Sequence, residues 1–133
     1  MGGNARAVAR AVLALAYVAV GFIHLKSPDN FLPIMPDWVP APREVVLATG
    51  VAEIAGAIGL MIPRLRQAAA WGLAAYAVCV FPANIKHAVD GIAINGQTLG
   101  WGYHGPRLLA QPLIVWWALW AGGVIAWPFR AAR

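Results

Sequence analysis

Charged residues are scarce in this chain. They make up 11% of its 133 residues, whereas hydrophobic residues make up 61%. A soluble domain of this size carries roughly 25% charged residues. The scarcity excludes an ordinary soluble protein and, together with a mean hydropathy of +0.66, indicates an integral membrane protein.

Cysteine is scarcer still, because Cys79 is the single example. One cysteine cannot form an internal disulfide, so a CxxC relay of the kind that membrane thiol oxidases use is excluded. The sequence also lacks a phosphate-binding loop, a dinucleotide-binding fingerprint and a nucleophile triad. These absences leave few of the common catalytic chemistries.

Four long apolar runs are what the chain does have, over residues 8–25, 45–62, 67–88 and 107–129. Each approaches or reaches the roughly 20 residues that a helix needs to cross a bilayer. The runs and their loops account for residues 1–133. The sequence therefore predicts an all-α fold, in which four transmembrane helices form an antiparallel bundle and a single membrane domain.

The loop between the first two runs is long and rich in proline, yet it is also apolar. Phe31, Met35 and Trp38 all lie in it. A solvated linker would not carry these side chains, and long loops in compact domains are often functional. We expect this loop to lie over the outer mouth of the bundle.

The net charge of +5 follows the predicted topology. Arginines at positions 6, 10, 64, 66, 130 and 133 fall on one side of four spans, and no acidic residue accompanies them. The other side holds Lys26, Arg43, Lys86 and Arg107 among acidic residues. The positive-inside rule then places both termini in the cytoplasm. Because topology explains the charge, we expect no nucleic-acid partner.

Glu53 lies in the middle of the second run, between Glu44 and Arg64. At 1.5 Å per residue it lies roughly 14 Å from either end of that helix. A charged side chain at this depth costs at least about 2.5–3.5 kcal/mol. Gly50 and Gly56 share its helix face, so Glu53 points at a neighbouring helix. It is the best candidate for a catalytic residue.

Further polar residues converge on the outer ends of the other helices. They are His24, Asn84, His87, Arg107 and Gln111. Tyr17 and Tyr76 lie deeper, at the depth of Glu53, and are its expected hydrogen-bond partners. The sequence predicts a polar, outward-opening funnel with Glu53 at its floor.

Structural roles are the alternative for each of these residues. Glu53 would then serve only helix packing, the histidines would be interfacial, and Arg107 would extend to the membrane surface. A metal site would use His24, His87, His104 and Glu53, but Glu53 is expected roughly 10 Å deeper than the histidines, which argues against one compact coordination sphere. A bis-histidine haem between the first and third helices is a further alternative. We assign no metal ligand.

The sequence resembles the DoxX family of small four-helix membrane proteins over roughly residues 10–127. The matching residues are Gly21, His24, Pro28, Phe31, Met35, Pro36, Pro40, Thr49, Gly50, Glu53, Gly56, Gly59, Leu60, Phe81, Pro82, Asn84, His87, Pro106, Arg107, Gln111 and Trp117. The resemblance implies a four-helix bundle in the inner membrane. Some members of that family are linked to thiosulfate:quinone oxidation and to membrane redox complexes, and distant eukaryotic relatives act as assembly chaperones or cargo receptors.

The leading functional hypothesis is a redox-associated membrane protein that binds a hydrophobic, quinone-like small molecule in the funnel. A non-enzymatic assembly factor or interaction protein is one alternative, and a small transporter subunit is another. We expect a subunit or binding protein rather than an enzyme on its own. The expected partners are the lipid bilayer, a redox complex or other membrane proteins, and a second copy of the chain.

Overall fold

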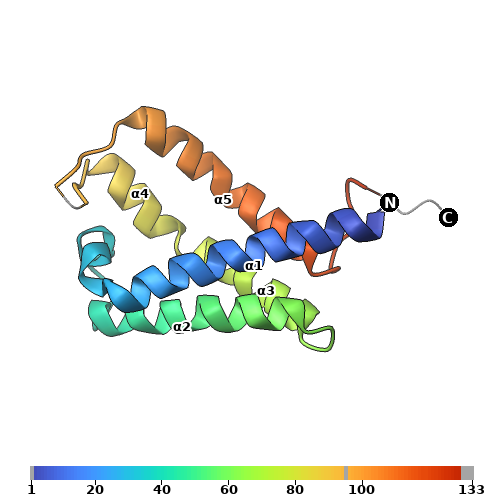
Figure 1. The fold of residues 1–133 in the computed structure, drawn as a ribbon. Coiled ribbons are helices and arrows are strands. Elements are labelled where there is room, and N and C mark those ends of the chain that lie inside the picture. Colours follow the sequence, from blue (N-terminus) through green and yellow to red (C-terminus); the bar gives the residue numbers. More distant parts are fainter. Residues whose placement is uncertain (1, 95, 130–133) are drawn as a thin grey trace.

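The computed structural model describes residues 2–94 and 96–129. Its regular elements in these residues are all helices (Figure 1). Its elements are α1 (Gly2–Lys26), the 3-10 helix η1 (Pro28–Ile34), α2 (Pro42–Met61), α3 (Arg66–Cys79), α4 (Phe81–Val89) and α5 (Trp101–Ala121). An isolated bridge between Ile94 and Gln97 is the single β-type pairing within these residues. The all-helical class predicted from the sequence is confirmed.

Three helical segments are long and apolar enough to cross a membrane: Gly3–Lys26, Pro42–Met61 and Arg66–Val89. Large apolar side chains cover their outer surfaces, and Leu15, for example, is 71% exposed. Because contiguous exposed apolar surface is rare on soluble proteins, these faces indicate a membrane protein. Helix α5 is comparably long but is not among the three, since its first half carries His104, Arg107 and Gln111.

The third apolar run does not form one regular helix. It divides at Val80 into α3 and α4, and Pro82 lies in the first turn of α4. Proline has no backbone N–H and is favoured at a helix start, which accounts for the position of the division.

The last helix begins and ends earlier than the predicted range 107–129. It starts at Trp101, so Pro106 lies inside it, and it ends at Ala121 before Gly122. Gly123 has a φ of +76°, which stops the helix and which glycine adopts without strain. The glycine-rich segment at this start has a low helix propensity, but His104 within it is 3% exposed. Packing of this segment therefore overrides its low propensity and extends the helix to Trp101.

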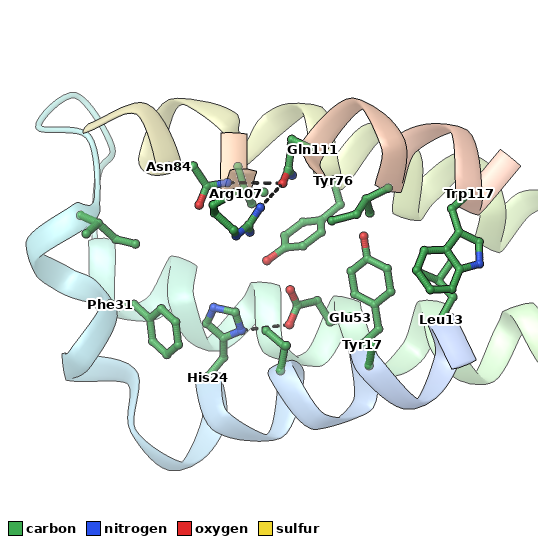
Figure 2. Close-up of a pocket in the computed structure, with 15 residues that line it drawn as sticks. Leu13, Tyr17, His24, Phe31, Glu53, Tyr76, Asn84, Arg107, Gln111 and Trp117 are labelled. Carbon is green, nitrogen blue, oxygen red and sulfur yellow. Dashed lines mark hydrogen bonds and ion pairs between the residues drawn. The ribbon is translucent and has the colours of Figure 1, made fainter. Parts of the chain in front are cut away.

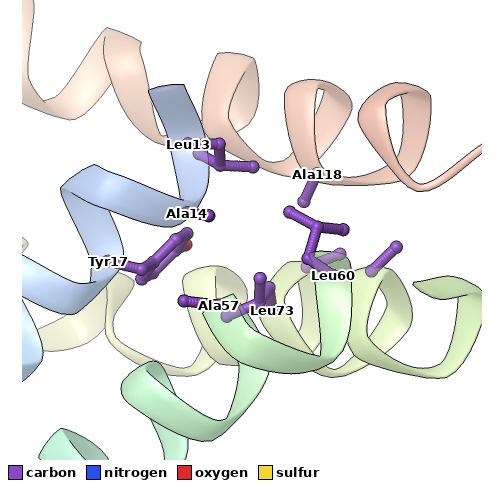
Figure 3. Packing of buried hydrophobic residues seen from close by; sticks show 9 residues of the cluster. Leu13, Ala14, Tyr17, Ala57, Leu60, Leu73 and Ala118 are labelled. Carbon is purple, nitrogen blue, oxygen red and sulfur yellow. The ribbon is translucent and has the colours of Figure 1, made fainter. Parts of the chain in front are cut away.

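The helices enclose a small interior of short side chains. Contacts join α1 to α2, α2 to α3, α3 to α5 and α5 to α1. The buried cluster includes Leu13 of α1, Ala57 and Leu60 of α2, Leu73 of α3 and Ala118 of α5 (Figure 3). Alanine is frequent in this cluster, so the helix backbones approach one another closely.

Helices α1 and α2 approach most closely at Gly21 and Gly50. A Cβ built on Gly21 would lie 2.8 Å from the carbonyl oxygen of Gly50, and one built on Gly50 would lie 2.9 Å from the carbonyl oxygen of Gly21. Neither position has room for a side chain. This contact determines how deeply the outer half of α1 sits against Glu53.

The proline-rich loop packs against the helices, as predicted. Ile34 is 9% exposed, and the ring of Phe31 lies 4.1 Å from the His24 ring, centroid to centroid. Lys86 of α4 donates hydrogen bonds to the Met35 carbonyl and to Asp37, both at 2.8 Å. The loop begins with a short 3-10 helix, η1, which continues through Pro33.

Candidate functional site

A buried hydrogen bond between His24 and Glu53 is the centre of the candidate site. His24 Nδ1 and Glu53 Oε2 are 2.9 Å apart, and the two residues are 9% and 3% exposed. The expected separation of roughly 10 Å in depth is therefore wrong for His24. Helical side chains point back toward the N-terminus, so His24 of α1 extends inward from its Cα.

His24 and Glu53 share one proton in their hydrogen bond. One proton lies between the two atoms in either form, because either the imidazole N–H donates to the carboxylate or the carboxylic acid donates to Nδ1. The arrangement can therefore accept or release a proton toward a ligand that lies beside it.

Tyr17 and Tyr76 lie next to this pair but do not replace His24 as its partner. Their rings meet edge to face with centroids 6.3 Å apart, and both hydroxyls point into the space above Glu53 (Figure 2). The hydrogen bond of 2.9 Å to Glu53 comes from His24 of α1, which was not among the expected partners, and the Tyr76 side chain also interacts with the Glu53 carboxyl.

Arg107 and Gln111 of α5 form the opposite wall. Arg107 donates a hydrogen bond to Gln111 Oε1 at 2.7 Å, and Gln111 in turn donates to the Ala77 carbonyl of α3 at 2.6 Å. Asn84 donates to the same Gln111 oxygen at 3.5 Å. Gln111 is 4% exposed, and these three bonds hold its amide group in place. Within the described residues Arg107 makes no ion pair with Glu53, so the two groups face each other across open space.

A cavity of about 270 Å³ separates these two walls (Figure 2). Apolar side chains complete its lining, among them Leu13, Phe31, Ile114 and Trp117. Sequence analysis did not assign Phe31 or Trp117 to the site. The apolar character of the loop pointed to Phe31, whereas neither depth nor charge separates Trp117 from the other tryptophans of α5. Cavities with apolar walls and a few converging polar groups are typical of small-molecule sites.

A second, more apolar cavity of about 280 Å³ adjoins the first. Five residues line both: His24, Phe31, Ile34, Tyr76 and Val80. Trp38, Met35 and Cys79 line the second cavity alone. Cys79 is exposed, so it is not the buried packing residue that its place within a helix suggests. The two cavities together join a polar chamber to an apolar one.

His87 is not part of this lining. Its ring lies 4.6 Å from that of His104 in α5, centroid to centroid, and Tyr103 packs against both histidines. The remaining predicted residues (His24, Glu53, Asn84, Arg107, Gln111, Tyr17 and Tyr76) all line the polar cavity. No group of three or more His, Cys, Asp or Glu side chains in the described part of the chain is placed to hold a metal ion.

Comparison with known proteins gives a family and no activity. A family model described as a domain of unknown function (DUF8561) matches residues 13–122. The chain belongs to the DUF8561 family. No curated protein and no solved structure matches it. The lining of the polar cavity runs from Leu13 to Trp117, so the whole candidate site falls inside the DUF8561 region.

Proposed function

We propose that this protein binds an amphipathic, quinone-like small molecule, with the polar head in the cavity beside Glu53. The observation that carries the proposal is the buried His24–Glu53 pair, which faces Arg107 across a cavity of about 270 Å³. A protonatable pair and a fixed cation on opposite walls suit a ring with an oxygen at each end. A redox-associated binding protein is the function that fits this arrangement best.

The proposed setting is an antiparallel bundle of four transmembrane helices in the inner membrane, with both termini in the cytoplasm. Helix α5 is the fourth span, and the closed series of contacts α1–α2–α3–α5–α1 supports this. The arginines at 6, 10, 64 and 66 support the orientation. Arg130 and Arg133, which the same reasoning used, lie outside the described residues. A relation between DUF8561 and the DoxX family belongs to the proposal.

Each wall has a separate part in recognising the head of the ligand. Arg107 donates to one carbonyl oxygen, and Gln111 holds the guanidinium in place through the bond at 2.7 Å. The His24–Glu53 pair lies at the other oxygen. Reduction of a quinone to a quinol takes up two electrons and two protons. The pair would deliver one proton to the ring oxygen beside it, water would deliver the second proton to the other oxygen, and both electrons would come from a partner redox protein.

The adjoining apolar cavity can accommodate the apolar tail of the ligand. It shares five lining residues with the polar cavity, so a molecule with a ring and a chain can occupy both. The wall between the two includes Phe31, which packs on His24. Shifting this aromatic ring would connect the two cavities, and a ligand could then approach from the lipid side rather than from water.

Mass spectrometry of what co-purifies with the protein tests this function. The full chain is extracted in mild detergent, and its bound small molecules are compared with those of Glu53→Gln and Glu44→Gln. Glu44 is exposed in the first turn of α2, so its variant removes the same charge outside the cavity. We expect a prenylated quinone or a similar ring-and-chain molecule in the wild type and in Glu44→Gln, and its loss in Glu53→Gln.

Other results of this experiment would contradict the proposed function or indicate another class of protein. Folded protein from which no amphipathic ring compound co-purifies, in any of the three forms, contradicts the proposed function. Stoichiometric capture of a membrane protein under the same conditions, unaffected by Glu53→Gln, would indicate an assembly factor.

A further inference from the structure

A second polar cavity, of about 370 Å³, lies at the opposite end of the molecule, where α1 begins and α5 ends (Figure 1). Four arginines line it: Arg6 and Arg10 of α1, Arg64 in the turn after α2, and Arg66 at the start of α3. Gln67 and the glycines that follow α5 complete the lining. We call this cavity the arginine basin.

Two of the arginines are anchored by a single atom each. Arg10 donates from Nε to the Ala121 carbonyl at 3.1 Å, and Arg66 donates from Nε to the Leu60 carbonyl at 3.2 Å. Both carbonyls lie at the C-terminal ends of helices, where backbone oxygens lack helical partners. The bonds fix each guanidinium plane but use only Nε. The terminal N–H groups therefore remain for another acceptor.

Arg6 carries a donor that nothing in the described structure satisfies. Its guanidinium lies 5.1 Å from the centre of the Trp120 ring, and its Nε is buried without a hydrogen-bond partner. Buried polar groups in folded proteins nearly always have a partner. Arg6 therefore adds a further guanidinium at this end of the molecule whose donors are not all satisfied.

No acidic side chain neutralises these arginines within the described residues. The five acidic residues of the chain are at positions 29, 37, 44, 53 and 90. The ion pairs that the structure contains involve Glu53, Asp29 and Asp37, none of which lines the basin. Like charges held in one concavity repel one another unless an anion lies between them. Topology explains why arginines occur at this end, but not why they line one cavity.

We propose that the arginine basin binds a phosphate group. The guanidinium group presents a rigid fork of N–H donors that matches phosphate oxygens two at a time, and Arg is the preferred residue for such recognition. The phosphate belongs either to the headgroup of an anionic lipid or to a free phosphate or diphosphate. This site is independent of the quinone-like ligand beside Glu53, and Arg6 and Arg10 lie outside the matched family region 13–122.

The test compares two double variants of the full chain in detergent, each of which replaces two basic residues with glutamine. Arg6→Gln with Arg64→Gln removes two charges from the basin and spares the two anchored arginines. Lys26→Gln with Arg43→Gln removes two charges at the other end, and neither residue lines the basin. Thermal unfolding of each variant first verifies that it is folded.

Two binding arms distinguish the sources of the phosphate. In one, inorganic phosphate and pyrophosphate are titrated by calorimetry at constant ionic strength. In the other, native mass spectrometry measures binding of phosphatidylglycerol against phosphatidylcholine. Saturable binding in the first arm indicates a free phosphate, and selective binding of phosphatidylglycerol alone indicates a lipid headgroup.

The basin variant should bind the effective probe at least about tenfold more weakly per arginine removed, which is about 1.4 kcal/mol each. The control variant should bind as the wild type does. Absence of saturable binding to every probe, or an equal loss in both double variants, would overturn the proposal, because diffuse positive charge would then account for the effect.

Discussion

Replacing Gly50 with alanine should separate α1 from α2 and weaken the bond between His24 and Glu53. A Cβ on Gly50 would lie 2.9 Å from the Gly21 carbonyl oxygen and 2.9 Å from His24 Cβ. Ordinary contacts begin at 3.4 Å, so α1 must shift by about half an ångström. Both neighbours are backbone or Cβ atoms, which cannot turn aside. Overpacking of this kind costs about 1–3 kcal/mol.

Gly72→Ala is the matched control. Gly72 lies inside α3, and a Cβ there would meet nothing within 4 Å. Alanine has a higher helix propensity than glycine by up to about 1 kcal/mol, so this variant should be as stable as the wild type or more so. Circular dichroism of unfolding in detergent measures the change in stability of Gly50→Ala and of Gly72→Ala. Equal stability of Gly50→Ala and Gly72→Ala would refute the close contact between α1 and α2.

Two further predictions concern the loop and the topology. The hydrogen bond from Lys86 lowers the pKa of the Asp37 carboxyl below its ordinary value of 3.8. The ionised carboxylate therefore stabilises the attached loop at a pH above 3.8, and this stabilisation is lost as the pH falls through the lowered pKa. Trp38 fluorescence should therefore report detachment of the loop in acid, and Lys86→Gln should remove the transition; a transition that persists in Lys86→Gln contradicts this origin. In a background without the native cysteine, cysteines placed at positions 2 and 96 should react with impermeant reagents from opposite sides of the membrane, and labelling of both from the same side would refute the topology.

The position of Glu53 could be predicted because it depends on local rules. A carboxyl in the middle of an apolar run must face other helices, and the neighbouring glycines identified the face that approaches α1. The same reasoning brought Tyr17 and Gln111 to the cavity. Depth counted along separate helices was sufficient for these residues, since each points inward from a regular helix.

Contacts that depend on where a helix is interrupted, or on the direction in which a side chain points, could not be predicted. Asn84 and His87 both lie in α4 and were both expected at the site, but His87 is one turn further from the break at Val80, so Asn84 lines the cavity while His87 packs on His104. The depth of His24 depends on the inward direction of its side chain. The packing of Phe31 on His24 is set by loop geometry that no periodicity encodes.

Titration with a short-chain quinone tests the central claim most directly. Decylubiquinone is added to the purified protein, and quenching of tryptophan fluorescence, to which Trp117 in the cavity wall contributes, gives a dissociation constant. Glutamine at position 53 keeps the shape and the hydrogen bond to His24 but cannot exchange a proton. Loss of a bond to an ionisable group costs about 1.5–3 kcal/mol, so Glu53→Gln should bind about 10- to 100-fold more weakly, while Glu44→Gln should be unchanged. Equal affinity in the wild type and Glu53→Gln would contradict a ligand site at the His24–Glu53 pair.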